Sequence, residues 1–140
     1  MDLIPYQRRA QYYETDMLGI IHHSNYIRWF EECRVDYLDQ IGYPYLQVEA
    51  SGISFPLLSL SCHYKSKVLF GDIVDIYCSI SSLSKTRMSM SYRINDSKSK
   101  ELRTTGETHH CFLRHSDNRP VSLERALPEL FALFFSLQEQ

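Results

Sequence analysis

Residues 12–41 read YYETDMLGIIHHSNYIRWFEECRVDYLDQI, and this stretch decides the fold. Its second part carries apolar residues at spacings of three and four, namely Tyr26, Ile27, Phe30, Cys33, Tyr37, Leu38 and Ile41. Such spacing predicts an amphipathic helix of about five turns that begins near Ser24. Gly42 follows the last apolar residue, as is typical of a helix C-terminus.

On either side of this helix the sequence has the features of β-strands. Two segments alternate polar and apolar residues with a period of two, and the others are rich in β-formers and bounded by turn residues. Pro128 can begin a short C-terminal helix, because proline is favoured in the first helical turn. The predicted strands span residues 5–13, 57–69, 73–80, 88–95 and 101–114.

This layout predicts an α+β fold, in which an antiparallel sheet of about five strands curls around one long helix to bury its apolar face. With 140 residues, the chain has the size of a single domain, residues 1–140. Two such units could join their sheets edge to edge and so remove exposed strand edges, which makes a homodimer plausible.

Composition excludes several classes of function. The formal net charge of -2 provides no basic field for nucleic acid. The longest apolar run, LFALFF, is far shorter than the roughly 20 residues of a membrane span, and MDLIPYQRRA has no secretory apolar region. The four cysteines are scattered without a C-x-x-C pair, so we expect buried thiols in a reducing cytoplasm.

The polar turn before the helix is the best candidate for chemistry. Asp16 lies three residues before Gly19, which permits a positive φ or a close approach of another group. The helix start that follows exposes unsatisfied N–H groups, which suit a developing oxyanion. The structural alternative is that Asp16 is an ordinary turn residue. Ser24 could cap the helix in either case, because a cap and a site can share one helix end.

Other polar groups predict less. His22 and His23 are adjacent and should point in different directions, so we expect no metal site. Glu31 and Arg34 have the i, i+3 spacing of a helical ion pair.

A small basic cluster, Lys85-Thr86-Arg87, lies between two predicted strands. It is either a solvated hairpin tip or a phosphate contact for an anionic ligand. No nucleotide-binding glycine motif and no serine-nucleophile motif is present.

Residues 12–34, YYETDMLGIIHHSNYIRWFEECR, resemble the signature of the 4-hydroxybenzoyl-CoA thioesterase family. That signature has an aspartate, a glycine three residues on, a histidine or tyrosine pair, N-Y, and a helix with W/F-x-E-x-x-R. The match is specific over residues 6–42, and looser matches such as G-D-x-V at 71–74 extend it over nearly the whole chain.

The resemblance implies a hotdog fold, an acyl-CoA thioesterase activity, and homodimers or homotetramers with active sites at the dimer interface. Asp16 falls on the catalytic carboxylate, and His23 on the residue whose backbone N–H polarises the thioester carbonyl. Gly19 and Tyr26 fall on substrate-site positions, and the resemblance slightly favours aliphatic acyl groups. His22 departs from the tyrosine or tryptophan common at its position, which leaves its role open.

For the reaction itself, a carboxylate that is ionised at neutral pH could attack the thioester or activate a water. The sequence does not distinguish these two routes. No cofactor is expected, since CoA is part of the substrate. We also expect Phe55, Leu57, Leu58 and Tyr64 to shape the acyl pocket.

Two other functions remain open. One is hydrolysis of acyl groups carried on acyl carrier protein, and the other is a non-catalytic hotdog protein that binds acyl-CoA. The acyl chain, the choice between dimer and tetramer, and the physiological pathway are not determined by the sequence.

Overall fold

The long helix predicted from the sequence lies at the centre of the structure. In the computed structural model, which describes residues 2–138, α1 spans Ser24–Gln40. Gly42 follows it with a φ of 83°, the left-handed conformation that ends helices. One face of α1 is buried against the sheet, through Tyr26, Trp29, Phe30, Cys33, Tyr37 and Leu38.

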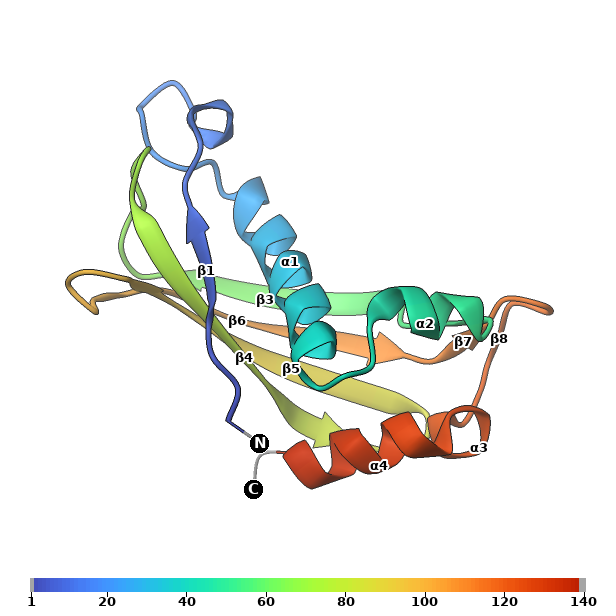
Figure 1. Ribbon diagram of the computed structural model, residues 1–140. Helices are drawn as coiled ribbons and strands as arrows, with labels where there is room; N and C mark the ends of the chain where they lie inside the picture. The colour runs from blue at the N-terminus through green and yellow to red at the C-terminus, as the bar shows by residue number, and fades with distance from the viewer. Residues whose placement is uncertain (1, 139–140) are drawn as a thin grey trace.

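A five-stranded antiparallel sheet curves around α1 (Figure 1). Its strand order is β1-β4-β5-β6-β3, and every neighbouring pair is antiparallel. The strands are β1 (Tyr6–Arg9), β3 (Leu57–Tyr64), β4 (Ile73–Leu83), β5 (Arg87–Asp96) and β6 (Leu102–Cys111). The predicted α+β class and the sheet of about five strands are therefore confirmed.

Several short elements were not predicted. The first strand is shorter than expected, because the chain leaves the sheet after Arg9 and forms the 3-10 helix η1 (Tyr12–Glu14). The additional elements are α2 (Tyr45–Ala50), α3 (Leu123–Ala126) and a small sheet of β2 (Ile53–Ser54), β7 (Leu113–Arg114) and β8 (Arg119–Pro120). The predicted C-terminal helix is confirmed as α4 (Pro128–Leu137).

Close packing between α1 and the middle of the sheet fixes the helix in place. The Phe30 ring stacks on the Tyr92 ring with centroids 4.3 Å apart. Gly106 on β6 leaves the space for Phe30, because a Cβ atom there would lie 2.5 Å from the ring. Between residues 2 and 138, no helix is long and apolar enough to cross a membrane.

Candidate active site

The turn before α1 holds Asp16 in a defined position. Its Oδ1 accepts hydrogen bonds from the backbone N–H groups of Leu18, at 2.8 Å, and Ile20, at 3.3 Å. Gly19 closes the turn with a φ of 78°, a conformation that favours glycine. Among residues 2–138, the other carboxylate oxygen, Oδ2, has no hydrogen-bond partner. One oxygen thus fixes the side chain, and the other has no hydrogen bond to the described residues.

The start of α1 offers a backbone donor to the same place. His23 is the residue before the helix, and its N–H has no acceptor within the described part of the chain. An unsatisfied N–H at a helix N-terminus attracts negative charge. Tyr26, one turn further, is buried, and this burial raises the pKa of its phenol. Its hydroxyl group therefore stays protonated at neutral pH.

These groups line one cavity of about 260 Å³. Asp16, His23 and Tyr26 come from the turn and the helix, and Tyr64 from the end of β3. The edge-to-face contact of the Tyr26 and Tyr64 rings, with centroids 5.2 Å apart, joins the two sides. The structure therefore brings the predicted pair Asp16 and His23 into one cavity, with Tyr26 on its wall.

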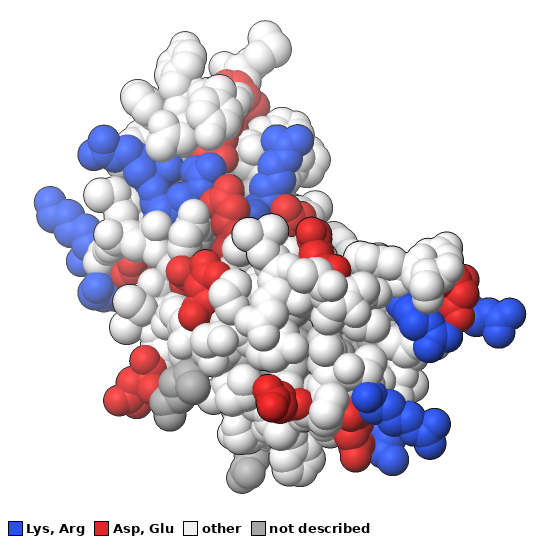
Figure 2. Space-filling model, turned by 45° about the vertical axis from the view of Figure 1, so that its right-hand side comes forward, with Lys and Arg blue, Asp and Glu red and all other residues white. Residues whose placement is uncertain are grey.

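Two cations that the sequence did not single out, Lys65 and Lys67, also line this cavity. Both are exposed, as expected for groups that meet an anionic ligand at its entrance. On the face shown in Figure 2, basic and acidic side chains are interspersed rather than gathered into one field. An anion near Asp16 would therefore meet a small local group of cations.

Glu14 holds the Asp16 turn in place through buried hydrogen bonds, a role that was not predicted from the sequence. Its side chain is only 3% exposed, and its Oε1 accepts from the Arg8 guanidinium at 2.6 Å. Oε2 accepts from the Trp29 indole N–H at 2.8 Å. Since Trp29 is on α1 and Arg8 on β1, one buried carboxylate ties the strand to the helix on both sides of Asp16.

The backbone of Glu14 accepts two further hydrogen bonds that hold the start of α1. Its carbonyl oxygen accepts from the His22 N–H and from the Asn25 side-chain amide, both at 2.9 Å. Asn25 is itself buried at the first turn of α1. A carboxylate in this setting is stable only with its partners, because a buried charge without them is costly.

His22 now has a structural role, and the assignment of Ser24 as the helix cap is wrong. Ser24 is already inside α1, and its Oγ contacts the Nδ1 atom of His22 at 2.9 Å. The Nδ1 atom of His22 also accepts from the Ser24 backbone N–H at 3.2 Å, so the imidazole satisfies a donor of the first turn. The expectation that His22 and His23 point apart is also wrong, because their ring centroids are 4.1 Å apart.

The remaining predicted groups lie elsewhere. Lys85 and Arg87 flank the β4–β5 turn at the other end of the sheet, where Lys85 lies 4.0 Å from Glu124. The predicted ion pair between Glu31 and Arg34 is not among the contacts within 4.0 Å in the described chain, and Arg34 donates instead to Tyr92.

Of the four residues expected to shape an acyl pocket, Tyr64 lines the Asp16 cavity. Phe55 and Leu57 line a second, larger cavity at the other end of α1. Leu58 is not among the lining residues of either cavity.

Comparison with known proteins shows the family of this chain. A family model described as the thioesterase-like superfamily matches residues 11–131. A protein of Aquifex aeolicus (strain VF5), named "Putative esterase", is 36% identical over 125 residues, which cover 89% of this chain and 94% of that protein. The 1,4-dihydroxy-2-naphthoyl-CoA hydrolase of Thermosynechococcus vestitus is 23% identical, covering 83% of this chain and 81% of the relative. The solved DHNA-CoA thioesterase of Staphylococcus aureus superposes with a TM-score of 0.89 at 31% identity, covering 94% of this chain and 87% of that chain.

Proposed function

This chain belongs to the thioesterase-like superfamily, and from that premise we propose that it hydrolyses acyl-CoA thioesters to a carboxylic acid and CoA. The observation that carries the proposal is that Asp16 and His23 line one cavity, where neither the Asp16 Oδ2 atom nor the His23 N–H has a hydrogen-bond partner among residues 2–138. The first supplies a base or nucleophile, and the second a donor for the thioester oxygen.

The same arrangement serves two routes. In one, the Asp16 carboxylate attacks the carbonyl carbon, the C–S bond breaks to release the CoA thiolate, and water hydrolyses the resulting anhydride. In the other, Asp16 takes a proton from a water that attacks the carbonyl carbon directly. In both routes negative charge develops on the carbonyl oxygen, where the His23 N–H stabilises it.

We propose that the working form is a homodimer, or a tetramer built from such dimers, with the active sites at the dimer interface. β3 forms one edge of the sheet, and its sequence LLSLSCHY has neither proline nor lysine to block pairing. Leu57, Leu58 and Tyr64 are 40%, 47% and 51% exposed on it. A long, uncharged edge of this kind is a ready site for pairing with a second copy.

An apolar tip near Asp16 also fits burial against a second copy. The exposed fractions are 73% for Tyr12, 79% for Tyr13, 102% for Met17 and 81% for Leu18. Large exposed apolar groups gathered at one place are typical of surfaces that a partner covers. Met17 and Leu18 are in the Asp16 turn itself, so the same partner would shield the reaction from water.

Antiparallel pairing of β3 with a second β3 would place opposite ends of the strand side by side. The Leu57 end of one protomer would then adjoin the Tyr64 end, and thus the Asp16 cavity, of its partner. Arg87 lies at the Leu57 end, because β3 pairs with β6 at His110 and β6 pairs with β5 at Cys111. Lys85 and Arg87 would thereby reach the phosphates of CoA bound to the partner.

The experiment that tests the function is CoA-thiol release over a panel of aliphatic and aromatic acyl-CoAs with wild type, Asp16→Asn and the control Asp39→Asn. Asp39 is an exposed aspartate near the end of α1. We expect Asp16→Asn to lower kcat by about 10²- to 10⁴-fold while binding persists, since it removes the base or nucleophile. Full activity in this variant would refute the role of Asp16.

The same assay on matched acyl-CoA and acyl-carrier-protein thioesters decides between the two carriers. Faster turnover on the CoA thioesters supports the proposal. A wild type that binds acyl-CoA but turns over neither carrier would instead be a non-catalytic binding protein.

Oligomeric state is tested separately on β3. The double variant Ser59→Lys and Ser61→Lys places like charges on an exposed edge near the expected two-fold axis. We expect sedimentation to show monomers of this variant with little activity, whereas the wild type sediments as a dimer or tetramer. A fully active monomer would contradict active sites shared between protomers.

A further inference from the structure

The irregular loop of residues 65–68 follows β3, and three of its residues, Lys65, Ser66 and Lys67, line the Asp16 cavity. Both lysine side chains are exposed. Among residues 2–138, neither ammonium group lies within 4.0 Å of a carboxylate. Cations without partners at the rim of a cavity attract an anionic part of its ligand. A loop outside the sheet must have other contacts to hold such groups in place.

Arg103 on β6 supplies these contacts with both its backbone and its side chain. Its carbonyl oxygen accepts from the backbone N–H groups of Lys65, at 2.9 Å, and Ser66, at 3.0 Å. Its Nη1 atom donates to the Ser66 hydroxyl at 3.1 Å and to the Lys67 carbonyl oxygen at 2.9 Å. One residue thus holds three consecutive loop residues, and the placement of both lysines depends on it.

The Arg103 guanidinium is itself fixed by two carboxylates. Its Nη2 atom lies 3.6 Å from Asp96, and its Nη1 atom lies 3.4 Å from Glu101, which also accepts from the Ser66 hydroxyl at 2.7 Å. The Arg103 side chain is only 18% exposed, and it is not among the residues that line the Asp16 cavity. Arg103 can therefore influence a ligand of this cavity only through the loop that it holds.

The end of the loop is joined to the Asp16 turn by contacts of its own. Val68 is fully buried, and its carbonyl oxygen accepts from the Ile21 N–H at 2.8 Å. Ile20 and Leu69 form an isolated β-bridge next to this bond. Neither contact involves Arg103. Shortening the Arg103 side chain should therefore loosen the two lysines and leave the Asp16 turn in place.

We propose that Arg103 is a positioning residue, which places Lys65 and Lys67 for the phosphate groups of CoA and so makes the chain prefer thioesters that carry phosphates. This inference rests on the proposed function. The phosphates are the anionic groups of CoA, whereas the pantetheine arm that carries the thioester is neutral. Without the Arg103 side chain the lysines remain, but they are no longer pre-organised, and pre-organisation is what lowers the cost of binding.

The test compares kcat and KM for one acyl group carried on CoA and on pantetheine, which lacks the phosphates. Arg103→Met should raise KM for the acyl-CoA by about three- to tenfold, the worth of two exposed ion pairs, with kcat unchanged. KM for the acyl-pantetheine should stay at the wild-type value. The control is Arg93→Met, whose guanidinium stacks on the Tyr77 ring, and which should leave both KM values unchanged. An equal rise of KM on both carriers, or no rise on acyl-CoA, would overturn the inference.

Arg103→Lys keeps the inference testable if Arg103→Met does not fold. Lysine keeps a charge beside Asp96 and Glu101 but lacks the planar fork of a guanidinium, so KM for acyl-CoA should rise by about two- to fourfold. In a protein that already carries Lys65→Ala and Lys67→Ala, the same substitution should have no further effect on KM, because Arg103 acts through these lysines. A further rise in that background would contradict the inference.

A binding measurement separates this inference from the proposed function. Calorimetry should show free CoA binding about two- to fourfold more weakly to Arg103→Lys than to wild type, with the affinity for pantetheine unchanged. This result together with no turnover in wild type would refute the hydrolysis and leave the role of Arg103 standing. Equal affinities for CoA in the two proteins would overturn that role even where hydrolysis is observed.

Discussion

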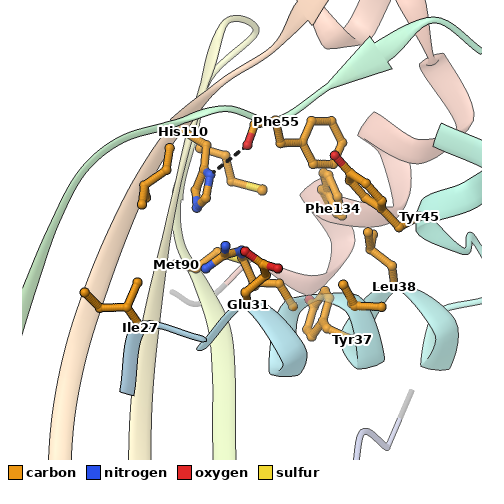
Figure 3. A pocket seen from close by; sticks show the side chains of 13 residues that line it. Ile27, Glu31, Tyr37, Leu38, Tyr45, Phe55, Met90, His110 and Phe134 are labelled. Carbon is orange, nitrogen blue, oxygen red and sulfur yellow. Dashed lines mark hydrogen bonds between the residues drawn. The ribbon is translucent and has the colours of Figure 1, made fainter. Parts of the chain in front are cut away.

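The two cavities beside α1 are built in opposite ways. The Asp16 cavity is lined by two short stretches, residues 16–26 and 64–67, and its key groups are a turn carboxylate and a backbone N–H. The larger cavity (Figure 3) is lined by side chains from residue 27 to residue 134, and its polar groups come from α1, α2 and β6. The Asp16 cavity is therefore encoded locally, whereas the larger cavity is assembled by tertiary packing. Substitutions and pH can perturb either cavity separately, or the packing of α1 between them.

Glu14→Gln should cause the largest loss of stability, and it should disturb the Asp16 cavity rather than the larger one. The substitution leaves the Arg8 guanidinium without its buried partner and weakens the acceptor for the Trp29 N–H. We expect a loss of about 3 kcal/mol in the free energy of unfolding, as for other broken buried ion pairs. Because Glu14 braces the turn on both sides of Asp16, kcat should fall as well, and urea unfolding with thiol-release kinetics measures both.

The matched control is Glu32→Gln. Glu32 accepts from the Nε atom of the same Arg8 guanidinium at 2.6 Å, but the Glu32 side chain is 36% exposed, so the loss should stay below about 1 kcal/mol. If the two variants were equally stable and equally active, Glu14 would not be the residue that holds the Asp16 turn in place.

The larger cavity can be perturbed by lowering the pH, because His110 in its wall takes up a proton at acid pH. Its pKa falls from 6.5 in the unfolded chain to about 4 in the folded protein, so the unfolded state takes up a proton first as the pH drops. The contribution of neutral His110 to the free energy of unfolding is thus complete above pH 6.5. It is lost as the pH falls towards about 4, and this lowers the free energy of unfolding by up to about 3 kcal/mol. Urea unfolding at several pH values should show this acid-side loss in wild type and a smaller one in His110→Asn.

His109→Asn is the control for this titration. His109 is adjacent in sequence, but its side chain is 41% exposed on the opposite face of β6 and contributes less to the lowered His110 pKa than burial and Arg34 do, so the variant should keep most of the acid-side loss. Identical pH dependence of wild type and His110→Asn would show that His110 is not buried in the neutral form.

Gly106→Ala should affect both ends of α1 alike, because it acts on the packing between the cavities. The new methyl group would lie 2.5 Å from the Phe30 ring, which is stacked on Tyr92 and has little room to move. Overpacking of this kind costs about 1 to 3 kcal/mol. Thermal unfolding should show the loss, and the double variant Gly106→Ala with Phe30→Leu should recover part of it. Additive losses in the double variant would exclude the clash as the cause.

The contrast between the cavities also explains what the sequence could predict. The helix, the five-stranded sheet and the resemblance to hotdog acyl-CoA thioesterases were readable because periodicity and the motif around Asp16 are local. Ser24 was misassigned because an ordinary cap residue precedes a helix, whereas here His22 supplies the acceptor from outside it.

The larger cavity could not be read in the same way. Thr108 and His110 are two residues apart on one strand and so share a face, but only folding brings them to Tyr92 and Arg34. The spacing of Glu31 and Arg34 suggested an ion pair on the helix. In the folded chain Arg34 instead donates a hydrogen bond to Tyr92 on the sheet. Glu14 escaped notice for a related reason, since a glutamate in a polar turn gives no sign that it will be buried.

The smallest expected effect concerns the cations at the two ends. Lys65 and Lys67 line the Asp16 cavity of their own protomer, whereas Lys85 and Arg87 lie at the far end and would reach it only from a partner. If the dimer brings these ends together, alanine at any of the four positions should raise KM for acyl-CoA by about two- to fivefold, the worth of an exposed ion pair, with kcat unchanged. The increases should shrink at high salt, because exposed charges are screened. A KM that depends on Lys65 and Lys67 but not on Lys85 and Arg87 would mean that CoA is held by one protomer alone, whereas the reverse would place its phosphates wholly on the partner.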